Sequence, residues 1–136
     1  MKLKIFFIKY ASILPIKVSF LLKLYPQKVI FPFYHSVSNV SQSFLNHLYQ
    51  VKTIDEFKRD IVFLLKHFEP ISKEKFVNWV EKKETISKPS FFLSFDDGLK
   101  SFLKVLSFLK ENDVSTINFL NSNFIDNKKL FYRYKV

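Results

Sequence analysis

The spacing of apolar residues predicts three helices along the chain. The first spans 54–68, where Thr53 and Glu56 form a capping box because each side chain can satisfy the other residue's free backbone N–H. The second is shorter, is capped by Ser72 and runs to about residue 82. The third follows residue 98 and is amphipathic. The predicted buried faces consist of Ile54, Phe57, Ile61, Leu64, Leu65 and Phe68 in the first helix, Phe76, Val77 and Val80 in the second, and Leu99, Phe102, Leu103, Leu106 and Leu109 in the third.

Three strands are predicted at 29–34, 91–95 and 116–120. Pro32 places the first of them at an edge or an irregular position, because proline has no N–H for the ladder. The strand–helix–strand order over residues 91–120 indicates a parallel, right-handed crossover. The chain is therefore expected to have an α/β fold with a parallel sheet.

Two neighbouring acids end the central predicted strand and suggest a metal site. Asp96 and Asp97 come directly before Gly98, the only glycine in the chain. Ligands of α/β folds bind outside the carboxyl ends of parallel strands, and adjacent like charges favour a cation between them. Gly98 allows the backbone to turn tightly beside the ion. His35 ends the first strand and reaches the same edge, where a lone histidine is more often a packed residue than a ligand.

The 136 residues are enough for one domain with a single core. The formal net charge is +10, and much of it lies in the N-terminal part of the chain. The first 54 residues hold seven lysines and no acid, whereas the rest hold 15 basic and 12 acidic residues. A basic amphipathic segment over residues 1–28 is expected either to meet an anionic surface or to form a solvated helix fringed with lysines. Residues 16–24 can form a short amphipathic helix that lies on a membrane or covers the end of a barrel, and the second role is favoured.

Composition excludes several classes of protein. Lys9, Pro15 and Lys17 interrupt the N-terminal apolar stretch, so neither a signal peptide nor a transmembrane helix is recognised and a cytoplasmic or membrane-associated location is expected. Without cysteine, disulfides and thiolate metal sites are not possible. No nucleic-acid partner is expected, because the lysines are dispersed among apolar residues and there are only two arginines, Arg59 and Arg133.

Three short motifs together resemble the polysaccharide deacetylases of the NodB-homology type. They are Phe95-Asp96-Asp97-Gly98 on a buried strand, Tyr34-His35-Ser36-Val37 about sixty residues earlier, and the strand-like Ser115–Leu120 run. The resemblance covers roughly residues 29–127. The tetrapeptide is specific because it lies between a strand and a helix.

The resemblance implies a distorted (β/α) barrel and hydrolysis of N- or O-acetyl groups on an acetylated polysaccharide, with zinc or a similar divalent metal as cofactor. Carried over to this chain, Asp96 matches the general base and Asp97 a metal ligand. His35 and Gly98 would line the same mouth. A divalent ion lowers the pKa of bound water and polarises the acetyl carbonyl, and a neighbouring carboxylate can take the proton.

The chain departs from the family in its second half. The family's remaining metal ligands are two downstream histidines spaced four or five apart, yet the 39 residues after Asp97 contain none. The three histidines, at 35, 47 and 67, do not have that spacing, although His35 and His47 could complete a site in another way. Three strands are also too few for a closed barrel of seven or eight. We therefore expect an incomplete (β/α) barrel-like domain over 29–136, the N-terminal portion of a deacetylase.

Two functional interpretations follow from this departure. One is a truncated deacetylase that is weakly active or inactive alone. The other is a non-catalytic fragment or interaction protein that needs a partner, such as a C-terminal half, to complete the barrel. A phosphoryl-transfer receiver domain is a third possibility, but the strand after the paired acids ends in Asn121 where that class needs an aspartate.

Overall fold

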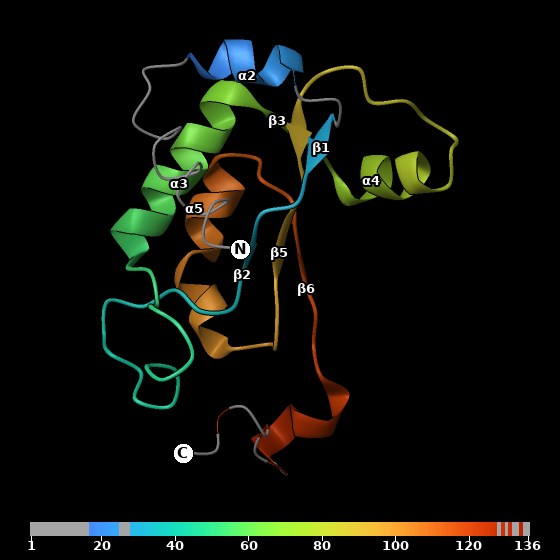
Figure 1. Cartoon of the computed structure of the whole chain (residues 1–136). Coiled ribbons are helices and arrows are strands. Elements are labelled where there is room, and N and C mark those ends of the chain that lie inside the picture. The colour runs from blue at the N-terminus through green and yellow to red at the C-terminus, as the bar shows by residue number, and fades with distance from the viewer. Residues whose placement is uncertain (1–16, 25–27, 128, 130, 132–133, 135–136) are drawn as a thin grey trace, which may run out of the picture.

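The computed structural model describes residues 17–24, 28–127, 129, 131 and 134, and shows an α/β fold in which helices flank parallel strands (Figure 1). Six short strands lie in the described part of the chain and form two three-stranded parallel sheets, with orders β1-β4-β3 and β2-β5-β6. They do not close into a barrel. The predicted fold class is confirmed. The strands are β1 (Val29–Ile30), β2 (Phe33–Tyr34), β3 (Glu69–Pro70), β4 (Ser90–Phe91), β5 (Leu93–Phe95) and β6 (Thr116–Asn118).

One predicted strand forms the centre of both sheets, and a second predicted strand pairs along one side of it. The predicted strand 29–34 corresponds to β1 and β2, and 91–95 corresponds to β4 and β5 with Ser90 added. The backbone amides of residues 90, 92, 94 and 96 donate to the carbonyls of residues 28, 30, 32 and 34 at 2.7–3.1 Å. The two segments therefore pair in one continuous parallel register, and Pro32 needs no N–H because its carbonyl makes the contact.

Two further strands pair with the other side of the 90–95 segment, β3 at its start and β6 at its end. β3 pairs with β4 and β6 pairs with β5, both in parallel. The predicted parallel crossover between β5 and β6 is confirmed. The prediction of three strands missed β3, because this strand is only two residues long and contains a proline. Proline is tolerated there because Glu69 and Ile71 donate the ladder bonds, to the carbonyls of Pro89 and Phe91.

Helix α3 (Ile54–His67) covers one face of the strands. The capping box predicted at its start is confirmed. Thr53 Oγ1 accepts from the Glu56 amide and the Glu56 carboxylate accepts from the Thr53 amide. The core on this side consists of Val37, Phe57, Ile61, Leu64, Phe91, Leu93, Phe95, Val105, Leu109 and Val114. The predicted apolar face of this helix is confirmed, with three residues buried and three partly buried.

The helix after Gly98 is built from two pieces. A 3-10 turn (η1, Lys100–Lys104) precedes α5 (Leu106–Glu111). The prediction that Leu103 lies on the buried face is wrong, because Leu103 is exposed and Ser101, Val105 and Leu109 are buried. A 3-10 turn has 3.0 residues per turn instead of 3.6, so it changes which positions face the core.

Helix α4 (Lys73–Val80) lies on the opposite face of the strands and is capped by Ser72 as predicted. The prediction that it buries Val77 and Val80 is wrong, because both are exposed. The predicted packing of Phe76 is confirmed, since its ring stacks on Phe92 with ring centres 4.4 Å apart, and Trp79 packs beside it in place of the valines. The two aromatic rings provide more area for burial than the valines, which determines the face that packs.

Only the part of this second face near β1 and β3 is covered by α4 (Figure 1). Towards the carboxyl ends of β2 and β5, large apolar side chains remain exposed. Phe33 is 62% exposed and Phe119 is 55% exposed. This uncovered area, which we call the open sheet face, borders the carboxyl ends where the predicted site residues lie.

Of the N-terminal segment predicted over residues 1–28, residues 1–16 and 25–27 lie outside the described residues. The amphipathic helix expected at 16–24 is present as α2 (Val18–Leu24). No helix in the described part of the chain combines the length and the apolar character needed to cross a bilayer.

Candidate functional site

The site is built at the carboxyl ends of two paired strands. β2 ends at Tyr34 and β5 ends at Phe95, and these two residues are partners in the register. The Asp96 amide donates to the Tyr34 carbonyl at 2.8 Å. His35 and Asp96 therefore follow two backbone positions that are fixed against each other.

The structure brings together Asp97 and His35, two of the predicted site residues. His35 Nε2 lies 3.8 Å from Asp97 Oδ2, although the two residues are 62 positions apart in the chain. Asp97 and Gly98 both have positive φ, at 66° each. This tight turn directs the Asp97 side chain back towards β2, and aspartate is one of the few residue types that enter this region of φ/ψ space.

Asp96 and Asp97 line a groove of about 600 Å³ on the open sheet face. Ser94 and Asn121 add polar groups, and the apolar side chains on the walls are Phe31, Phe33, Phe119 and Leu120. Because it has one wall of paired carboxylates and another of aromatic and aliphatic groups, the groove suits a ligand with both polar and apolar faces.

Two aromatic rings hold the His35 imidazole. The Phe33 ring meets it edge-on with centres 5.8 Å apart, and the Tyr49 ring lies against it at 5.4 Å. Burial, together with the negative charge of Asp97, raises the pKa of Tyr49 to about 12. Tyr49 therefore stays neutral around His35 at ordinary pH. Its hydroxyl is buried without a hydrogen-bond partner among the described residues.

A second tyrosine contacts the acid itself. The Tyr134 hydroxyl donates to Asp97 Oδ2 at 2.5 Å. Tyr134 also lines a second hollow, of about 480 Å³, together with Asp97, Gly98, Gln42 and Phe124. The Asp97 carboxylate thus lies between two hollows, and one of its oxygen atoms accepts the hydrogen bond from Tyr134.

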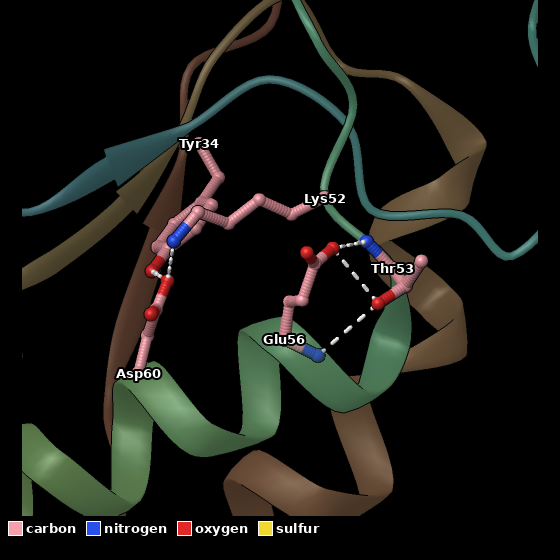
Figure 2. A network of polar contacts seen from close by, with 5 residues as sticks. All are labelled: Tyr34, Lys52, Thr53, Glu56 and Asp60. Carbon is pink, nitrogen blue, oxygen red and sulfur yellow. Dashed lines mark hydrogen bonds and ion pairs between the residues drawn. The ribbon is translucent and has the colours of Figure 1, made fainter.

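A polar network anchors β2 to α3 behind the site (Figure 2). The Tyr34 hydroxyl donates to Asp60 Oδ2 at 2.7 Å, and Lys52 forms an ion pair with the same oxygen. Burial raises the pKa of Tyr34 well above its usual range, and the hydrogen bond and negative charge of Asp60 add to the effect. Since Tyr34 immediately precedes His35, this anchor determines where the imidazole lies.

The described residues do not make a complete metal site. No three His, Cys, Asp or Glu side chains among them are grouped so as to hold an ion. Among the predicted site residues in the described part of the chain, only Asp97 and His35 are found with their side chains close to each other. The alternative metal site with His47 is not formed, and the His67 ring packs on Phe63 with centres 4.8 Å apart. Zinc therefore stays a prediction, and these donors alone do not fit it.

The predicted site residues did not include Tyr49, Tyr134 and Asn121. Asn121 could have been found, because it follows β6 and so reaches the same edge as Asp96. The two tyrosines lie in segments without a periodic pattern, so the sequence does not indicate that Tyr49 contacts His35 or that Tyr134 contacts Asp97.

The fold is similar to that of a solved de-N-acetylase from Aggregatibacter actinomycetemcomitans. The TM-score is 0.59 at 20% sequence identity, over 76% of this chain and 42% of that chain. The chain thus spans less than half the length of that protein. No protein-family profile matches the chain, and no curated protein matches it. The fold is deacetylase-like, and membership of the NodB-homology family stays a prediction.

Proposed function

We propose that the chain is a carbohydrate deacetylase-like protein that contributes the carboxylate half of a hydrolytic site. The observation that carries the proposal is the approach of His35 to Asp97 beside Asp96, at the carboxyl ends of β2 and β5. The similarity of the fold to a de-N-acetylase supports it. The substrate class is an N- or O-acetylated polysaccharide.

Asp96 is the proposed general base. It lines the groove beside Ser94, where an acetyl group and a water molecule can reach it. The water oxygen attacks the carbonyl carbon as the carboxylate takes its proton, and the bond to the sugar nitrogen or oxygen then breaks to release acetate. His35 is the proposed donor of a proton to the leaving group, because its imidazole lies 3.8 Å from Asp97, which lines the same groove.

Asp97 is the proposed ligand for a divalent metal, and zinc is the candidate. A bound divalent ion polarises the acetyl carbonyl and acidifies water. Structural and catalytic zinc sites need at least three protein ligands, and the described residues do not provide a group of three. We propose that the missing ligands come from polypeptide outside these 136 residues, so that the isolated chain binds zinc weakly and has low activity.

The test is acetate release from N-acetylated chito-oligosaccharides and from O-acetylated oligosaccharides, with and without added zinc. A slow, zinc-dependent release is expected, and Asp96→Asn should reduce it by about 10²-fold or more because the base is lost. Asp97→Asn should remove the zinc dependence. Asp113→Asn is the matched control, since Asp113 lies in the turn after α5 and also has a positive φ. Release that does not differ between the wild type and Asp96→Asn would reject the assignment of the base.

The open sheet face supports a second candidate function, that of an interaction protein whose partner completes the sheet. Phe33, Phe119 and Leu120 present apolar surface there. The portion of the solved de-N-acetylase that this chain does not match provides a precedent for the missing half. Size-exclusion chromatography combined with thermal unfolding tests this function. A stable monomer with a cooperative melt contradicts it, whereas assembly that is lost in Phe33→Ser supports it.

A further inference from the structure

We propose that α2 binds the protein to an anionic lipid bilayer, with the paired acids directed away from the membrane. This inference does not depend on the proposed hydrolytic function. It rests on the exposure of α2, the charge around it, and its position in the fold.

Helix α2 presents apolar side chains to solvent. None of its residues is buried. Phe20, Leu21 and Leu24 are exposed, with Leu24 at 68%. At 100° per residue, these three side chains occupy neighbouring positions on the helix surface, so they form one apolar strip. Leu21 and Leu24 also border a shallow hollow of about 380 Å³ that Ile30 and Phe68 complete.

Positive charge surrounds this strip. Lys17 and Lys23 lie beside it and are exposed, and Lys28 follows the helix. The first 54 residues contain seven lysines and no acidic residue. An exposed apolar strip bordered by lysines is typical of a helix that lies in the interface of a membrane with anionic headgroups.

The same charge argues against other occupants of the strip. A second copy of the chain would bring its own Lys17, Lys23 and Lys28 to the contact and would be repelled. A nucleic acid would satisfy the lysines but would leave the apolar strip uncovered. A bilayer with anionic lipids satisfies both features, because headgroups meet the lysines and acyl chains meet Leu24.

The position of α2 leaves the candidate site free. α2 lies at the end of the molecule where β1 and β3 lie, and the chain leaves β5 for the paired acids at the other end (Figure 1). A membrane bound at α2 would therefore not cover the groove that contains Asp96. The groove would face the solution, away from the lipid surface.

Vesicle co-sedimentation of the full chain tests the proposal. We expect binding to phosphatidylcholine vesicles that contain phosphatidylglycerol, and at least tenfold weaker binding to pure phosphatidylcholine. Raising the salt from about 0.1 M to about 1 M should weaken the binding, since the Debye length falls from about 10 Å to about 3 Å. Equal binding to both kinds of vesicle, or no binding to either, would overturn the proposal.

Matched substitutions locate the contact. Leu24→Glu should weaken binding by about tenfold or more, because it removes an exposed leucine that would insert among the acyl chains and adds a charge that anionic headgroups repel. Val62→Glu is the control, since Val62 is an exposed apolar residue on α3, at 57%. Lys23→Gln should weaken binding about fivefold. Equal loss in Leu24→Glu and Val62→Glu would refute the role of α2, as would a dimer in solution that Leu24→Glu dissociates.

Discussion

The Tyr134 hydroxyl donates to Asp97 Oδ2 at 2.5 Å, so a residue 37 positions later in the chain closes against the paired acids. This hydrogen bond has an ionisable acceptor, and such bonds are shorter and about twice as strong as neutral ones. It ties residue 134 to the carboxyl end of β5.

Tyr134→Phe should lower the free energy of unfolding by about 1.5 kcal/mol, because a hydrogen bond to a charged group is lost. In an Asp97→Asn background the same change should cost about half as much, since the acceptor is then a neutral amide. Urea unfolding of the four proteins gives the coupling energy. If the two losses are equal, the Tyr134 hydroxyl does not interact with the carboxylate in solution.

Stability should decrease in alkaline solution partly because of Tyr49. Its pKa is raised to about 12 in the folded protein, whereas a phenol in the unfolded chain has a pKa of about 10. The unfolded chain therefore releases this proton first, and the stability present below about pH 10 is lost as the pH rises to about 12.

Tyr49→Phe removes this titration and should flatten the dependence of the unfolding free energy on pH between about 10 and 12. At neutral pH the same variant should be as stable as the wild type or more stable, because the Tyr49 hydroxyl is buried without a partner among the described residues. Urea unfolding at several pH values measures both effects. An unchanged alkaline slope would show that the hydroxyl is solvated.

Thr53→Ala should destabilise the protein by about 1 kcal/mol, because it removes the N-cap acceptor of α3. The matched control is Ser107→Ala on the exposed side of α5, which should change stability by less than about 0.5 kcal/mol. Circular dichroism during urea unfolding checks both. Equal effects would mean that the capping box does not stabilise α3.

Gly98→Ala should destabilise the protein by about 1–2 kcal/mol, because the φ of +66° is unfavourable for residues with a Cβ. The added Cβ would also lie 2.7 Å from Leu120 Cδ2, but the Leu120 side chain is exposed and can move. Gly98→Asn should cost less, since asparagine tolerates this conformation better. Combining Gly98→Ala with Leu120→Ala tests the assignment, because full recovery would identify the steric contact as the cause.

The features that depend on local sequence were predictable. The paired acids at the end of a strand, the capping box at Thr53 and the parallel crossover after Gly98 are set by residues within about thirty positions of each other. The approach of His35 to Asp97 was also predictable, because the carboxyl ends of parallel strands share one edge.

The features that depend on tertiary packing were not predictable. β3 is two residues long and contains Pro70, so neither its length nor its composition indicates a strand. In α4 the valines and the aromatic residues both show helical spacing, and the stacking of Phe76 on Phe92 determines which of them pack. Tyr49 reaches His35 and Tyr134 reaches Asp97 from segments that follow no periodic pattern.

The ladder described above makes the segment from Ser90 to Asp96 different from every other strand. Its backbone is hydrogen-bonded on both sides, to residues 28–34 on one side and to β3 and β6 on the other. Within the part of the chain that the structure describes, each neighbouring strand pairs with this segment alone. Amide hydrogen exchange should therefore be slowest between Ser90 and Asp96. β6 should exchange sooner, by a local opening that leaves the β1 and β3 end intact.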